Sequence, residues 1–201
     1  MSLLLESIKV HKNKIFAWKY HEQRIERSLH VCYAKDYDNL ISIESLQKYV
    51  DQLDDKLYKL RIIYDDHSYK IEHHLYKIKA INSLKLVYDD NISYSEKYAD
   101  RESLNKLYAQ KKIADDILIV KNGLITDTHY CNVALLKEGR WYTPAKPLLC
   151  GVKRQELIDE NVIEERDILA KDIKSYTHIR LFNAMVEFGE VELTKGCVLK
   201  L

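Results

Sequence analysis

Hydrophobic and polar residues alternate along the first third of the chain in a way that predicts short strands and amphipathic helices. Residues 3–18 contain two hydrophobic runs separated by His-Lys-Asn-Lys, a pattern typical of a β-hairpin. Residues 21–34 have the period of a helix. Its predicted buried side carries Ile25, Leu29 and Cys32.

A second helix and three strands are predicted next. Residues 42–53 begin with Ser42, a good N-cap, and the expected buried face consists of Leu46, Tyr49, Val50 and Leu53. Residues 56–64, 69–81 and 83–88 then have strand-like patterns. We expect an antiparallel sheet with helices on one face.

The polar stretch 89–103 interrupts this pattern and is rich in turn-forming Asp and Ser. We therefore predict an N-terminal α/β domain over residues 1–90, an interdomain segment over 91–99, and a C-terminal domain over 100–201. The second domain should be a mixed sheet with helices. Its expected elements are a helix at 101–112, strands at 115–121, 133–136 and 178–185, an Asn-Gly turn, and a helix that begins near Val152.

Composition narrows the possible partners. The 201 residues include 32 Lys and Arg and 31 Asp and Glu, so no net field favours nucleic acid or an acidic membrane. No hydrophobic run reaches the roughly 20 residues of a membrane span, and the N-terminus does not resemble a secretion signal. We expect a cytoplasmic protein whose four scattered cysteines are reduced.

Most common cofactor motifs are missing. The chain has neither a Gly-rich nucleotide loop nor a G-x-S-x-G turn, and its eight histidines do not have zinc-site spacing, so no metal is expected. Gly151 does precede a predicted helix. The amides of Val152 and Lys153 would then form an anion site, although an ordinary loop-to-helix glycine is the simpler interpretation of that motif alone.

Two ordered blocks, "GLITDTHYCNVALL" and "WYTPAKPLLCGVKR", together with "NAM" at residues 183–185, resemble the class IV pyridoxal-phosphate enzymes. This family includes branched-chain and D-amino-acid aminotransferases and aminodeoxychorismate lyase. The resemblance runs from Leu3 to the end of the chain. It implies a two-domain α+β fold of type IV with a shortened N-terminal domain, pyridoxal 5'-phosphate (PLP) as cofactor, a small-molecule substrate and a homodimer.

The resemblance also implies roles for individual residues. Lys97 would carry the cofactor as an internal aldimine, and Asp127 would pair with the pyridine nitrogen, where the family usually has the longer Glu. Arg24 would bind the cofactor phosphate from the N-terminal domain. Four further residues would complete the phosphate site: Val152, Lys153, Asn183 and Ala184.

Within the family, three features favour the lyase. Lys97 is followed four residues later by Arg101, "NAM" resembles the lyase segment, and the reduced substrate architecture suits a reaction without a second keto-acid half. This lyase releases pyruvate and 4-aminobenzoate from 4-amino-4-deoxychorismate, in folate biosynthesis. An amino-acid transaminase and a binding protein without catalytic activity remain alternatives. Candidates for the substrate carboxylate are Arg101, Tyr130 and Arg61.

Overall fold

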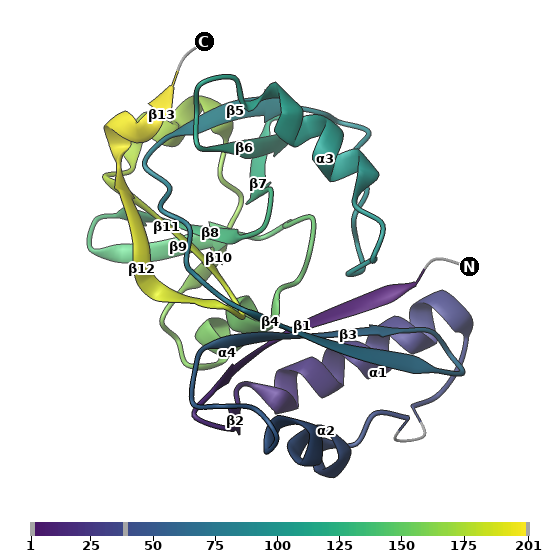
Figure 1. Ribbon diagram of the computed structural model, residues 1–201. Helices are drawn as coiled ribbons and strands as arrows, with labels where there is room; N and C mark the ends of the chain where they lie inside the picture. The colour runs from purple at the N-terminus through teal and green to yellow at the C-terminus, as the bar shows by residue number, and fades with distance from the viewer. Residues whose placement is uncertain (1–2, 38–39, 200–201) are drawn as a thin grey trace. The chain divides into compact units, whose positions relative to one another are not determined.

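The computed structural model describes residues 3–37 and 40–199. The chain forms two compact units, which are drawn in Figure 1. Unit 1 comprises Met1–Ile78 and Glu96–Asp100, and unit 2 comprises Lys79–Ser95 and Arg101–Leu201. Residues 79–90, which the sequence interpretation assigned to the N-terminal domain, therefore group with unit 2.

Unit 1 contains a four-stranded antiparallel sheet with the order β2-β1-β3-β4. Its strands are β1 (Leu4–His11), β2 (Lys14–Ile15), β3 (Tyr58–Tyr64) and β4 (Tyr69–Leu75). The predicted hairpin is confirmed, because β1 and β2 pair across a turn at Lys12 and Asn13, both with positive φ.

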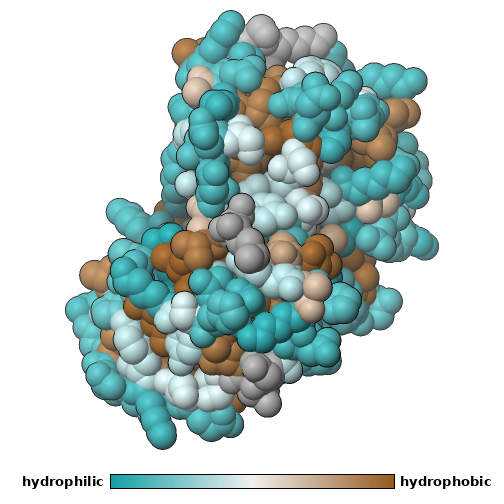
Figure 2. Space-filling model, turned by 90° about the vertical axis from the view of Figure 1, so that its right-hand side faces the viewer, coloured by the Kyte–Doolittle hydropathy of each residue, from teal (hydrophilic) through white to brown (hydrophobic). Residues whose placement is uncertain are grey.

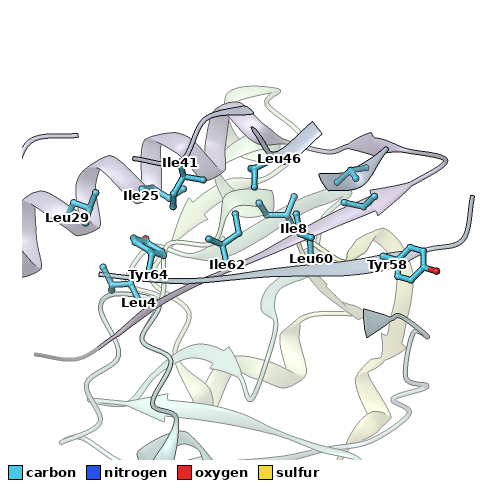
Figure 3. Close-up of a cluster of buried hydrophobic side chains, with 12 residues drawn as sticks. Leu4, Ile8, Ile25, Leu29, Ile41, Leu46, Tyr58, Leu60, Ile62 and Tyr64 are labelled. Carbon is cyan, nitrogen blue, oxygen red and sulfur yellow. The ribbon is translucent and has the colours of Figure 1, made fainter. Parts of the chain in front are cut away.

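Two helices cover one face of this sheet (Figure 3). They are α1 (Trp18–Tyr33) and α2 (Ile43–Val50), and Ser42 caps α2 by accepting a hydrogen bond from the Ser45 amide at 3.2 Å. The predicted helix faces pack on the core, although Cys32, Tyr49 and Leu53 are only partly buried and Leu53 lies beyond the end of α2. The buried core comprises Leu4, Ile8, Val10, Ile25, Leu29, Ile41, Leu46, Val50, Tyr58, Leu60, Ile62 and Tyr64.

Unit 2 contains two mixed sheets, whereas one mixed sheet was predicted for the second half of the chain. One has the order β10-β9-β8-β11-β12 and the other β13-β5-β6-β7. The strands are β5 (Leu84–Tyr88), β6 (Asp116–Lys121), β7 (Leu124–Thr128), β8 (Asn132–Lys137), β9 (Arg140–Pro144), β10 (Glu164–Arg166), β11 (His178–Asn183), β12 (Val186–Thr194) and β13 (Val198–Leu199).

Within the described part of unit 2, two α-helices and three short 3-10 helices accompany these sheets. They are α3 (Glu102–Tyr108), η1 (Ala109–Lys111), α4 (Val152–Asp159), η2 (Ala170–Ser175) and η3 (Lys195–Cys197). The predicted turn joins β6 to β7, with Asn122 at φ 51° and Gly123 at φ 75°. This left-handed conformation suits Asn-Gly, because glycine has no Cβ to oppose it.

Two strand predictions were wrong in part. The strand predicted over 69–81 ends at Leu75, which pairs with Tyr58, the first residue of β3. Residues 83–88 do form β5, but this strand pairs in parallel with β6 of unit 2 and does not join the first sheet. An alternating pattern indicates a strand without identifying its neighbour.

On the face shown in Figure 2, hydrophobic residues lie in small groups among hydrophilic ones. No helix among the described residues is long and apolar enough to cross a membrane.

Candidate functional site

Arg24 lies on α1 with a buried carboxylate as its partner. Its Nε donates to Glu6 Oε1 at 2.8 Å, and its Nη2 donates to Glu6 Oε2, so the two planar groups meet in a bidentate pair. Arg24 is 4% exposed and Glu6 is fully buried. Burial alone would raise the pKa of Glu6, but the Arg24 charge and hydrogen bonds from His21 and Arg24 lower it to about 2.

His21 contacts the same carboxylate. Its Nδ1 lies 2.6 Å from Glu6 Oε2, while its buried Nε2 has no hydrogen-bond partner within the described chain. Burial lowers the pKa of His21, so the ring is neutral. Because Glu6 is an ionised acceptor, Nδ1 carries the proton and Nε2 carries a lone pair.

Lys97 lies in a short segment that extends the sheet of unit 1. The Leu5 amide donates to the Lys97 carbonyl at 2.8 Å, the Ala99 amide donates to the Leu3 carbonyl at 2.8 Å, and Tyr98 pairs with Leu4. Lys97 is half-buried. The structure therefore places Lys97 and Arg24 in one unit, and the Lys97 charge also contributes to the lowered pKa of His21.

In unit 2, Asp127 lies in β7 with its carboxylate surrounded by donors. Asn132 Nδ2 donates to Oδ1 at 2.8 Å, and the amides of Leu148 and Leu149 donate to Oδ2 at 2.8 and 3.0 Å. Burial raises the pKa of Asp127 to about 6, against the lowering effect of these hydrogen bonds. A carboxylate has about four acceptor positions, so about one remains, on Oδ1.

Gly151 is the N-cap of α4 and packs against Asn132. A Cβ at this position would lie 2.0 Å from Asn132 Oδ1, so only glycine fits here. The cap makes no side-chain hydrogen bond, and the first-turn amides, including those of Val152 and Lys153, have no carbonyl one turn earlier in the helix. The Lys153 ammonium is paired with Glu156 at 2.5 Å and Glu187 at 2.8 Å. Any contribution of Lys153 to an anion site is therefore through its backbone amide.

Asn183 closes the turn between β11 and β12. Its Oδ1 accepts from the amides of Met185 and Val186 at 2.8 and 3.1 Å, and its Nδ2 donates to the Tyr130 carbonyl at 3.2 Å. The side chain of Asn183 thus fixes the backbone around Ala184.

Two of the three candidates for the substrate carboxylate lie together in unit 2. The Arg101 guanidinium lies 4.3 Å from the Tyr130 ring centroid, and its Nη2 donates to the His129 carbonyl at 2.5 Å. Arg101 Nε and His129 Nδ1 are buried without a partner among the described residues. Arg61 lies in β3 of unit 1 and pairs with Glu72 at 2.9 Å.

Known proteins that resemble this chain indicate one family. A family model described as amino-transferase class IV matches residues 97–193. An uncharacterised protein of Haemophilus influenzae is 36% identical over 182 residues, which are 90% of this chain and 97% of that protein. The chain belongs to the class IV aminotransferase family.

Relatives within class IV include proteins named as lyases. A crystal structure from Haemophilus somnus, provisionally named a 4-amino-4-deoxychorismate lyase, is 34% identical with a TM-score of 0.85, over 92% of this chain and 97% of that one. A protein of Schizosaccharomyces pombe, provisionally named an aminodeoxychorismate lyase, is 35% identical over 89 residues, 41% of this chain and 38% of that protein. The fold is the mixed α/β fold of type IV, as expected.

The sequence interpretation missed several residues that surround the predicted ones. Glu6 was not noticed, although the strand alternation places it on the same face as Leu4, Ile8 and Val10. His21 was likewise overlooked, although it lies one helical turn before Arg24 and Ile25 on the buried side of α1. An acid or imidazole on an otherwise apolar face was the available signal. The amides of Leu148 and Leu149 gave no such signal.

Proposed function

We propose that this class IV protein is a PLP-dependent enzyme. The class is PLP-dependent, and three features of the chain fit a phosphorylated pyridine. These are an uncapped helix start at Gly151, whose close packing requires glycine, the remaining acceptor position on Asp127, and a buried arginine at position 24. The uncapped helix start beside Asn132 and Asp127 is the observation that carries the proposal.

Several residues would hold the cofactor. Arg24 would bind the phosphate, and the Lys97 amine would attach the cofactor. The amides of Val152 and Lys153 and the turn at Asn183 and Ala184 would also bind the phosphate. Bound PLP supplies an electron sink.

Asp127 would accept a hydrogen bond from the pyridinium through its remaining Oδ1 position. The donors from Asn132, Leu148 and Leu149 hold the carboxylate at a fixed orientation. Its pKa, raised to about 6 by burial, makes ionisation sensitive to a nearby cation. A pyridinium would lower that pKa and keep the carboxylate charged.

We favour the release of pyruvate and 4-aminobenzoate from 4-amino-4-deoxychorismate as the reaction. The support is the likeness to the Haemophilus somnus protein that carries the lyase name, which extends over 92% of this chain. In this reaction Lys97 would move a proton as general base and then general acid once its amine is released. Arg101 and Tyr130 would bind a substrate carboxylate, and Arg61 is the weaker candidate because Glu72 already pairs with it.

A transaminase is the second candidate, since the same class contains amino-acid aminotransferases. Such an enzyme must accept an amino acid and a keto acid in turn. A third candidate is a cofactor-binding protein without catalytic activity, which the Asp at position 127 favours. By analogy with the class we also propose a homodimer that acts in the cytoplasm.

The first test is cofactor attachment. Purified protein incubated with PLP should become yellow and retain the colour after dialysis, and Lys97→Ala should lose it. Lys106→Ala, which removes an exposed lysine that pairs with Glu102, is the matched control and should remain yellow. A colourless wild-type protein would contradict both enzyme candidates.

The second test separates the reactions. Lyase activity predicts release of pyruvate and 4-aminobenzoate from 4-amino-4-deoxychorismate. A transaminase would instead transfer an amino group to 2-oxoglutarate, and amino transfer without lyase turnover would refute the favoured reaction. A yellow protein inactive in both assays would support the third candidate.

A further inference from the structure

Three buried polar residues of unit 1 form one connected group. Glu6 is on the inner face of β1, and His21 and Arg24 are on the inner face of α1. These three side chains are at most 4% exposed. Burying so many polar groups is costly unless they are paired, so their hydrogen bonds to one another are essential to the arrangement.

The geometry of this group determines how Arg24 can meet another anion. Of the five guanidinium N–H groups, Glu6 takes the Nε proton and one Nη2 proton. Up to three remain, two of them on Nη1. Because the pair is bidentate and planar, the plane of the guanidinium is fixed and the Nη1 edge has one orientation.

His21 fixes the carboxylate in turn. Its Nδ1 lies 2.6 Å from Glu6 Oε2, the same oxygen that accepts from Arg24 Nη2. Rotation of the Glu6 carboxylate would break both contacts. His21 therefore holds the Glu6 carboxylate in place, and Glu6 holds the Arg24 guanidinium in place.

We propose that Glu6, supported by His21, is a positioning residue that orients Arg24 for the phosphate of the cofactor. This inference rests on the proposed role of Arg24 as a phosphate ligand. Glu6 does not contact the phosphate. Glu6 fixes the guanidinium before the cofactor binds, so Arg24 loses less conformational entropy on binding. The Nη1 edge of Arg24 then remains as the phosphate-binding edge.

The test compares two probes, PLP and pyridoxal, which lacks the phosphate. Dissociation constants are measured by equilibrium dialysis for the wild type, Glu6→Gln, Arg24→Gln and the double variant. Asp54→Asn is the matched control, because it removes one carboxylate of unit 1 from an exposed pair with Lys56. Circular dichroism and thermal unfolding without cofactor check the fold of each variant.

Glu6→Gln should weaken PLP binding by about 10- to 100-fold, the range known for removal of outer partners of metal ligands, and leave pyridoxal binding nearly unchanged. In the Arg24→Gln background the same change should have little further effect, because Glu6 acts through Arg24. Asp54→Asn should bind both probes like the wild type.

Other outcomes distinguish the phosphate role of Arg24 from the positioning role of Glu6. Unchanged PLP binding in Arg24→Gln would overturn the phosphate role of Arg24 itself. A selective loss in Arg24→Gln without one in Glu6→Gln would overturn only the positioning role, as would equal losses for PLP and pyridoxal. If Glu6→Gln does not fold, His21→Gln keeps the Glu6 to Arg24 pair and should still lose PLP affinity selectively, by several-fold. The absence of that loss would also overturn the proposal.

Discussion

Replacement of Asp127 by asparagine should change the pH dependence of stability. The carboxylate is 6% exposed and accepts hydrogen bonds from Asn132, Leu148 and Leu149. Burial raises its pKa from the ordinary 3.8 to about 6. The folded protein therefore holds a proton on Asp127 at pH values where the unfolded chain has lost it.

Proton linkage determines whether Asp127 makes stability rise or fall with pH. Between pH 3.8 and about 6 the folded state binds more protons than the unfolded state at this residue, so Asp127 makes stability fall as pH rises through that window. The full effect is about 3 kcal/mol, at about 1.4 kcal/mol for each pKa unit. Between pH 5 and pH 7.5 the expected part is about 1.4 kcal/mol.

The amide introduced by Asp127→Asn does not titrate, so the variant lacks this dependence. It should also be less stable than the wild type by a constant amount of about 1–3 kcal/mol, because an amide has only one acceptor oxygen for donors on two sides. Asn132 cannot turn its amide to compensate, since its Nδ2 also donates to the Leu149 carbonyl at 2.9 Å.

The assay is urea unfolding of both proteins without cofactor at pH 5, 6, 7 and 7.5. His21 and His129, whose lowered pKa values give the opposite slope in this range, contribute equally to both proteins and cancel in the difference. The wild type should lose about 1.4 kcal/mol relative to the variant between pH 5 and pH 7.5. A difference that is constant over this range would refute the assignment of a raised pKa to Asp127.

Three further predictions concern other parts of the structure. Gly151→Ala should lower the free energy of unfolding, measured in urea, by about 1–3 kcal/mol, because the new Cβ would lie 2.0 Å from Asn132 Oδ1. In the control Gly196→Ala, the new Cβ would meet open space, so no loss from a steric clash is expected. Burial lowers the pKa of His129 to about 4, so its ring protons should show no NMR titration between pH 5.5 and 7.5, and a midpoint near 6.5 would contradict the packing described. Glu6, with its pKa lowered to about 2, should contribute stability above pH 4.5 that is lost as pH falls toward 2, so the wild type should lose about 3 kcal/mol relative to Glu6→Gln over that range, and parallel acid unfolding curves would refute this.

Much of the fold was predictable from the hydrophobic pattern. The predictions that were wrong have physical causes. The α1 and α2 faces followed from helical spacing because those faces pack on a sheet. The strand expected over 69–81 stops at Leu75 because β3, its hydrogen-bonding partner, begins opposite at Tyr58. The side-chain alternation continues beyond Leu75, but a strand needs a neighbour whose length is set elsewhere in the chain.

The candidate site residues came from the ordered motifs of the family resemblance. The structure gives Arg24, Asp127, Gly151 and Asn183 defined hydrogen-bond or packing environments, while their roles toward a cofactor remain proposals. The partners of these residues could not be obtained in the same way. Asp127 is held in part by backbone amides, which every residue other than proline carries and which therefore leave no trace in composition.

The partners of Arg24 were indicated by the sequence pattern, and the same signal applies to other proteins. A strand whose alternation places Glu6 among Leu4, Ile8 and Val10 must pair that acid inside the protein, because an unpaired buried carboxylate would be protonated or would prevent folding. Cations and N–H or O–H donors can pair it, and α1 carries a cation at Arg24 and an N–H donor at His21 on its buried side. An acid on an apolar strand face and a cation on an apolar helix face are therefore each evidence for the other, and they identify a buried pair before any distance is known.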